Sequence, residues 1–279
     1  MTAHAPSRGI VCLAALDLRR TPDHRSELTS QLLSGEVVRI LGLTRDRQWC
    51  RVENRADGYR GWARGWGLTP ASTLAAARWT RRARARVRVS TVEARMRPGG
   101  GPLVSPLFWN ARLIPGGRRG RHREVVLADG RRAWVPASAL DLGRSRPPSL
   151  ISRVRDLLGV PYLWGGRTPL GFDCSGFTQQ VLAEQGVRLP RDAQHQFERG
   201  LRVPDGALPR AGDLVFFGRA GRPVGHVGLA LGGSYFAHAR GWVRISSLES
   251  SNPLCDRELD GSYRGCRRPR RPRLRPDST

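Results

Sequence analysis

The chain has 279 residues, of which 48 are basic and 23 acidic, giving a formal net charge of +25 at pH 7. This length exceeds one typical domain and allows two or three domains with separate cores. Every basic residue is an arginine, which indicates a compositional bias along the whole chain more than a dedicated basic site. No apolar run has the length of a membrane-spanning helix, so we expect no membrane span.

The first apolar run, residues 10–16, is seven residues long and continues into Asp17 and Arg19. It is too short for a secretion signal and predicts a first β-strand. The five cysteines are an odd number, so at least one is unpaired. Cys255 and Cys266 can pair if oxidised, but without a secretion signal we expect free thiols and a cytoplasmic protein.

Short strand-like runs separated by turn residues follow, at 30–41, 48–52 and 57–62. This pattern is typical of a small β-barrel. We place the first barrel in residues 1–75.

A second unit opens at residues 86–89 and closes at 124–135. Its segment 129–134 (DGRRAW) echoes 57–62 (DGYRGW) in the first unit. This weak internal repeat predicts a second barrel in residues 76–142.

Residues 143–149 contain a proline pair and predict a stiff, extended linker. A short amphipathic helix is expected from Leu150 to Leu158, at the start of a further domain in residues 150–268. The tail, residues 269–279, is rich in arginine and proline and has almost nothing to bury, so we expect it to be disordered.

The most informative segment surrounds Cys174. After Asp173, apolar residues recur at helical spacing until Gly186, so Asp173 is the expected N-cap of a helix. Cys174 then lies in the first helical turn, where unpaired N–H groups and the helix dipole favour thiolate over thiol. A cysteine in this position is suited to act as a nucleophile.

Two of the six histidines lie on neighbouring strand-like runs. His226 opens the first run and His238 lies in the second, with Gly232 and Gly233 between them. The two rings share one face of a hairpin only if the connection has an odd length or a bulge, and a three-residue loop of 232–234 satisfies this. His226 can then act as a base for Cys174, while His238 orients it.

Other interpretations compete with this one. A buried lone cysteine is usually inert packing, and a strand histidine is usually a hydrogen-bonded structural residue. A zinc site from Cys174, His226 and His238 is a further alternative, although no closely spaced ligand pair supports it.

Six segments of residues 148–268 occur in the order typical of NlpC/P60 cysteine peptidases. They are PYLWGG (161–166), FDCSGF (172–177), LPRD (189–192), AGDLVFF (211–217), GHVG (225–228) and FAHA (236–239). The resemblance implies an α+β, papain-like catalytic domain without a cofactor or metal. It also implies that Cys174 is the nucleophile, His226 the base and His238 the residue that orients the base.

The upstream strands, with GYRGW at 58–62, resemble bacterial SH3-type domains. Two such barrels before an NlpC/P60 domain resemble enzymes that cut released murein peptides between γ-D-glutamate and the diamino acid. By this resemblance, Asp192, Tyr59 and Glu27 hold the free amine of an N-terminal L-alanine. An ammonium taken out of water needs matching oxygens, which an N-acylated peptide cannot use in the same way.

Four more residues are expected to bind substrate: Asp173, Ser175, Tyr162 and Trp164. Asp173 also has a purely structural interpretation as a helix cap, and the two aromatic residues have one as packing. The family commonly has serine at the position of Ala193, so one hydroxyl contact to the peptide is expected to be missing.

The resulting hypothesis is a peptidase that releases L-Ala-D-Glu from murein peptides during cell-wall recycling. One alternative is a binding protein for wall material or nucleic acid, although no recognition helix accompanies the arginine clusters and nucleic acid is disfavoured. Another is an amidase or acyltransferase on the same scaffold, for which no hydrophobic extension is present. Diaminopimelate and lysine both remain open at the third peptide position.

Overall fold

The structure is a computed structural model that describes residues 7–143 and 146–270. Part of the expected linker and most of the expected disordered tail lie outside the described residues. Contacts divide the chain into a first unit, residues 1–146 and 164–170, and a second unit, residues 147–163 and 171–279. Among the described helices, none combines the length and apolar character needed to cross a membrane.

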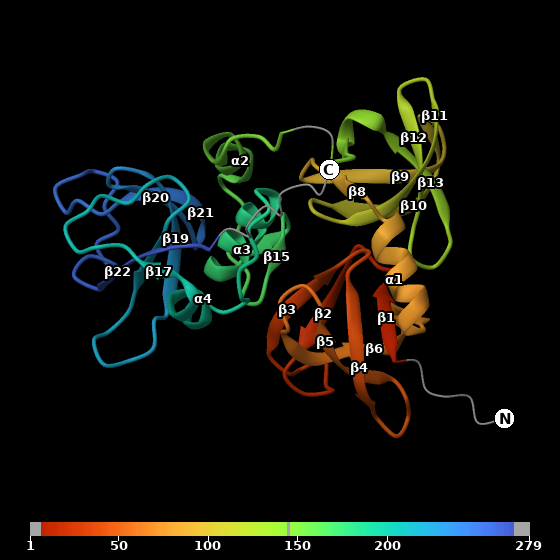
Figure 1. Cartoon of the computed structure of the whole chain (residues 1–279), viewed down its shortest axis with the longest axis horizontal. Coiled ribbons are helices and arrows are strands. Elements are labelled where there is room, and N and C mark those ends of the chain that lie inside the picture. The colour runs from red at the N-terminus through yellow and green to blue at the C-terminus, as the bar shows by residue number, and fades with distance from the viewer. Residues whose placement is uncertain (1–6, 144–145, 271–279) are drawn as a thin grey trace, which may run out of the picture. The chain divides into compact units, whose positions relative to one another are not determined.

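The first sheet of the first unit has seven antiparallel strands in the order β3-β2-β6-β5-β4-β1-β7 (Figure 1). The run 10–16, expected as one strand, is divided between two strands that do not pair with each other. The order is that of an open sheet with β3 and β7 at its edges, so the expected barrel closure is not found. The strands are β1 (Arg8–Val11), β2 (Ala15–Arg19), β3 (Leu28–Leu33), β4 (Val37–Leu43), β5 (Trp49–Asn54), β6 (Arg60–Arg64) and β7 (Leu68–Ala71), with a 3-10 turn at Gly65–Gly67.

The second sheet repeats this arrangement strand for strand, in the order β10-β9-β13-β12-β11-β8-β14. Each sheet buries its own cluster of small and branched apolar side chains. The topology therefore extends the weak repeat noted in the sequence. The strands are β8 (Ala85–Val87), β9 (Thr91–Arg97), β10 (Gly100–Phe108), β11 (Arg112–Arg119), β12 (His122–Val126), β13 (Arg132–Pro136) and β14 (Leu140–Asp141), with a 3-10 turn at Ala137–Ala139.

A helix, α1 (Thr73–Arg82), connects the two sheets and was not expected from the sequence. The Ser72 side chain caps it by accepting a hydrogen bond from the backbone N–H of Ala75. The buried Trp79 donates from its indole N–H to the carbonyl of Gly35 at 2.9 Å. This contact fixes the helix on the first sheet.

Residues 164–170, which include β15 (Arg167–Thr168), belong to the first unit and lie against β3. The buried Arg167 donates to the Glu36 carboxylate at 3.0 and 3.2 Å, and its backbone N–H donates to the side chain of Gln31 at 3.0 Å. Gly165 has φ +75°, and a Cβ there would meet the Leu28 carbonyl oxygen at 2.4 Å. A segment close in sequence to Cys174 is thus built into the first unit.

The second unit contains a six-stranded antiparallel sheet in the order β17-β22-β18-β19-β20-β21, and α3 packs against β19 and β20 (Figure 1). The expected helix at 150–158 is confirmed as α2. The strands are β16 (Gly171–Phe172), outside this sheet, and β17 (Leu201–Arg202), β18 (Leu214–Phe217), β19 (His226–Gly232), β20 (Tyr235–Arg240), β21 (Trp242–Ser247) and β22 (Tyr263–Arg268). The helices are α2 (Leu150–Leu157), α3 (Cys174–Glu184) and α4 (Ala193–Arg199).

Candidate active site

The candidate site begins at the N-terminus of α3. The short strand β16 ends at Phe172, and Asp173 then adopts an extended conformation that ends the strand and opens the helix. The Asp173 carboxylate accepts a hydrogen bond from the backbone N–H of Gly176 at 2.6 Å. Cys174 therefore occupies the first helical position, as the sequence predicted, and it is buried.

A buried arginine holds this capping carboxylate. Arg191 donates to both oxygens of Asp173 and, at 2.9 Å, to the hydroxyl of Ser175. Only 1% of the Arg191 side chain is exposed, so the guanidinium and the carboxylate compensate each other in a site without bulk water. Asp173 and Ser175 thus have a structural role around Cys174, and their expected substrate contacts stay predictions. Sequence reasoning assigned no role to Arg191.

His226 and His238 are brought together as expected. His226 Nε2 lies 2.8 Å from His238 Nδ1, and His238 Nε2 lies 3.0 Å from the Ser246 hydroxyl. His238 is fully buried, and its ring packs on Phe236 with a centroid separation of 4.9 Å. The three side chains form one line of hydrogen bonds that runs inward from His226.

A bulge in the hairpin places the two histidine rings on one face of the sheet. Leu229 pairs with Ala237 and Ala230 with Phe236, and the register shifts at Gly232, which has φ +109°. In this register His226 and His238 lie on the same face, offset diagonally across the two strands. The bulge, one of the two solutions expected, thus replaces the three-residue loop.

The Cys174 thiol lies at the start of β19. Backbone N–H groups of Val227 and Ser175 are close enough to the thiol to lower its pKa, which places the sulfur near the residue that follows His226. Burial and the nearby Asp173 carboxylate nevertheless raise the pKa of Cys174 to about 12. This is opposite to the thiolate preference expected from the helix dipole, because loss of hydration outweighs the N–H donors.

Burial also lowers the pKa of His226 to about 4, with a further contribution from the positive charge of Arg240. Burial lowers the pKa of His238 to about 3, followed by the effect of His226. At neutral pH the resting site therefore holds a thiol and two neutral imidazoles. A neutral His226 can accept the thiol proton as the sulfur attacks, which is general-base chemistry without a preformed ion pair.

The zinc alternative requires the ring nitrogens to converge on one point. In the structure, His226 and His238 instead point one nitrogen each at the other, at hydrogen-bond distance. Within residues 7–143 and 146–270, no group of three or more histidine, cysteine or acidic side chains is arranged to hold a metal ion. The geometry favours a proton relay over a metal centre.

Tyr162 belongs to the second unit and is close enough to Cys174 and Asp173 to be influenced by them. Burial raises the pKa of its phenol, and so do the negative charge that Cys174 gains on ionisation and the Asp173 carboxylate. A protonated phenol beside the thiol is a hydrogen-bond donor across the whole physiological pH range. Tyr162 is therefore an expected substrate residue that lies near the nucleophile.

The remaining expected substrate residues are divided between the units. Asp192 is in the second unit, at the N-cap of α4, where it makes no side-chain capping bond, and 43% of its side chain is exposed. Tyr59 is in the first unit and packs against the core of the first sheet. Glu27, also in the first unit, accepts from the indole N–H of Trp164 at 2.8 Å and pairs with Arg20 at 2.5 Å. Trp164 itself is largely exposed.

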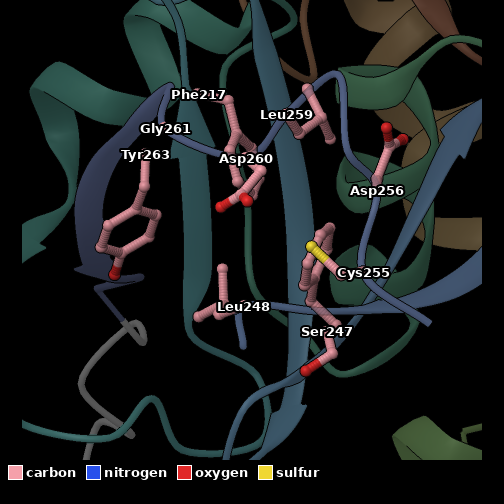
Figure 2. A pocket seen from close by; sticks show the side chains of 10 residues that line it. Phe217, Ser247, Leu248, Cys255, Asp256, Leu259, Asp260, Gly261 and Tyr263 are labelled. Carbon is pink, nitrogen blue, oxygen red and sulfur yellow. The ribbon is translucent and has the colours of Figure 1, made fainter. Parts of the chain in front are cut away.

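The second unit also contains a pocket (Figure 2). It is lined by Phe217 and Phe236 on the sheet and by the segment 255–263, which includes Cys255. None of Cys174, His226 and His238 lines it. The five cysteines of the chain are all free thiols.

Comparison with known proteins identifies two types of domain in the chain. Residues 159–258 match the model of the NlpC/P60 family, and residues 18–64 match the model of the bacterial dipeptidyl-peptidase SH3 domain. The chain carries an NlpC/P60 domain behind an SH3 domain of the dipeptidyl-peptidase type. The second sheet has no counterpart in these matches.

Curated relatives match part of the chain. Two are named gamma-D-glutamyl-L-lysine dipeptidyl-peptidase: the Bacillus cereus protein is 33% identical over 124 residues and the Bacillus subtilis protein 40% over 105. These matches cover 41% and 37% of this chain, and 37% and 35% of the relatives' own lengths. A murein DD-endopeptidase/LD-carboxypeptidase of Escherichia coli is 45% identical over 102 residues, 36% of this chain and 53% of that protein.

Solved structures extend the similarity of fold to nearly the whole chain. An NlpC/P60 family protein from Bacillus cereus superposes with a TM-score of 0.78 at 24% identity, covering 94% of this chain and 99% of that one. An NlpC/P60 endopeptidase from Photobacterium damselae superposes with a TM-score of 0.69 at 16% identity, covering 87% and 66%. At these identities the likeness concerns the fold.

Proposed function

We propose that the chain is a cysteine peptidase that hydrolyses the γ-D-glutamyl bond to the diamino acid in murein peptides. The observation that carries the proposal is Cys174 at the start of α3, beside β19, whose first residue His226 is hydrogen-bonded to His238. Cys174 attacks the side-chain carbonyl of D-glutamate while His226 takes the thiol proton and then returns it to the leaving amine. Water then releases L-Ala-D-Glu.

Backbone N–H groups around the thiol are suited to stabilise the oxyanion. The N–H of Ser175 lies in the first turn of α3, where the helix leaves such donors unpaired, and the N–H of Val227 approaches from β19. Donors fixed by secondary structure need no rearrangement when charge develops on the substrate oxygen. Tyr162 is a third candidate donor beside the thiol.

The substrate class is supported by the two Bacillus relatives named for γ-D-glutamyl-L-lysine peptides and by the SH3 domain at residues 18–64. We propose that the second sheet is a second SH3-type domain, because its seven strands follow the order of the first. We further propose that Asp192, Tyr59 and Glu27 recognise the free amine of L-alanine, with Asp173, Ser175, Tyr162 and Trp164 around the peptide. Such recognition suits recycling of released peptides.

A peptidase of intact wall is the competing function, since another relative is named a murein DD-endopeptidase. The two functions differ in the end of the substrate that they require. Purified protein is incubated with L-Ala-γ-D-Glu-diaminopimelate, its lysine analogue and the N-acetylated form of each, and products are identified by mass spectrometry. The proposal expects L-Ala-D-Glu from the free peptides alone and none with Cys174→Ala. Equal cleavage of the acetylated peptides refutes recognition of the amine.

A further inference from the structure

Ser246 is the inner end of the hydrogen-bonded line that starts at His226. Its hydroxyl lies 3.0 Å from His238 Nε2, and both residues are buried. Ser246 is on β21, directly opposite Phe236, and therefore lies on the same face of the sheet as His238. A buried hydroxyl at this distance from a buried imidazole is a specific hydrogen-bond partner for it.

The positions of the protons decide whether His226 can act as a base. With Nε2 of His226 directed at His238, its other nitrogen, Nδ1, is the one left to meet the thiol. To accept a proton there, Nδ1 must be bare and Nε2 must carry hydrogen, which makes His238 Nδ1 an acceptor. His238 must then carry its own hydrogen on Nε2 and donate it to Ser246.

The opposite arrangement also satisfies each hydrogen bond but disables the site. If Ser246 donates to His238 Nε2, then His238 Nδ1 carries the hydrogen and donates to His226 Nε2. The remaining proton of His226 then occupies Nδ1, so the ring cannot accept a proton from the nucleophile. The choice between the two arrangements is made at the inner end of the line.

We propose that Ser246 is a positioning residue that accepts a hydrogen bond from His238 Nε2 and thereby sets the tautomers of both histidines. The inference rests on the proposed role of His226 as the base. Ser246 contacts His238, which in turn contacts His226, so it acts through two rings. His238 is fully buried, so bulk water does not compete with the hydroxyl for its Nε2.

Three variants test this: Ser246→Ala, which removes the acceptor; Ser246→Thr, which keeps a hydroxyl; and Ser247→Ala, the control. Ser247 is the adjacent buried serine, but it pairs with Tyr235 and its hydroxyl accepts from the N–H of Glu249 at 3.1 Å. In Figure 2 it appears beside Cys255 at the pocket. The tautomers are read from two-bond ¹H–¹⁵N spectra of ¹⁵N-histidine-labelled protein at neutral pH, with His238 assigned by its loss in His238→Asn.

The wild-type protein and the Ser247→Ala and Ser246→Thr variants are expected to show His226 and His238 with hydrogen on Nε2. Ser246→Ala is expected to populate the Nδ1–H form and to lose about tenfold in kcat with little change in KM, the size of one hydrogen bond between neutral groups. A wild-type His238 protonated on Nδ1, or a Ser246→Ala protein with unchanged tautomers and kcat, overturns the proposal. If the wild-type protein cleaves no murein peptide, the proposed function fails, whereas the spectra still decide the tautomer.

Discussion

The buried pair of Arg191 and Asp173 offers a quantitative test of how the nucleophile is held. The Arg191 side chain is 1% exposed and that of Asp173 11%. Replacing Arg191 by methionine keeps most of the side-chain volume but leaves the carboxylate without its cation. Breaking a buried pair in this way costs about 3–5 kcal/mol of unfolding free energy.

The charge of Arg191 also affects the pKa of Cys174. Arg191 lowers the pKa of the thiol and Asp173 raises it, so Arg191→Met moves this pKa upward. The variant should therefore react more slowly with iodoacetamide at a fixed pH than the wild-type protein, since only the thiolate is alkylated. Alkylation and unfolding are two independent readouts of one substitution.

The double variant Arg191→Met, Asp173→Asn separates charge from packing. Asparagine keeps an oxygen that can accept the Gly176 N–H but carries no charge, so the double variant should be more stable than Arg191→Met by about 2 kcal/mol or more. Arg155→Met, on the exposed side of α2, is the control and should change stability by less than about 0.5 kcal/mol. Urea unfolding curves supply the values. A loss below about 1 kcal/mol for Arg191→Met, or a double variant no more stable than the single one, refutes the reasoning.

Four further outcomes are expected. Burial lowers the pKa of His226 to about 4 and raises that of Cys174 to about 12. We therefore expect kcat/KM to stay level from about pH 5 to 9 and to fall below about pH 5 as His226 becomes protonated. A kcat/KM that rises from about pH 7 to 9 contradicts a resting pair of neutral thiol and neutral imidazole. At a pH between the lowered pKa values of His226 and His238 and the ordinary histidine pKa, the folded protein binds fewer protons than the unfolded chain. The free energy of unfolding should therefore decline as the pH falls from about 6.5 towards 4. Urea unfolding in buffers of constant ionic strength measures this decline. His226→Ala should lose at least about 10³ in kcat/KM and His238→Ala less, with comparable melting temperatures, and equal losses argue against a subordinate role for His238. At Gly165 a Cβ would meet the Leu28 carbonyl oxygen at 2.4 Å, so Gly165→Ala should destabilise the first unit by more than about 2 kcal/mol. Gly58 has φ +77° but open space around it, so the control variant Gly58→Ala should cost about 1 kcal/mol. Similar losses of stability in the two variants contradict the close approach at Gly165.

The parts of the site that depend on local sequence were predictable. An aspartate before helical periodicity identified the cap of α3, and counting residues between the two histidines showed that their hairpin needs a bulge or an odd loop. The segment 73–82 carries a comparable signal for α1, because Ser72 precedes a run of good helix formers.

The remainder depends on contacts between distant parts of the chain. The direction of the Cys174 pKa shift is decided by burial under β19, which the helix terminus alone does not reveal. Ser246 joins the site because β21 pairs with β20, and nothing in its own sequence distinguishes it from Ser247. Likewise, residues 164–170 belong to the first unit through contacts with distant residues, among them the hydrogen bonds of Arg167 to Glu36 and Gln31.

The most direct test of the central claim compares the wild-type protein with Cys174→Ala on L-Ala-γ-D-Glu-diaminopimelate. Mass spectrometry of the products reports both the bond that is cut and the need for the thiol. We predict that the wild-type protein yields L-Ala-D-Glu and free diaminopimelate, while Cys174→Ala yields neither. The same products from Cys174→Ala, or cleavage at another bond by the wild-type protein, would contradict the account.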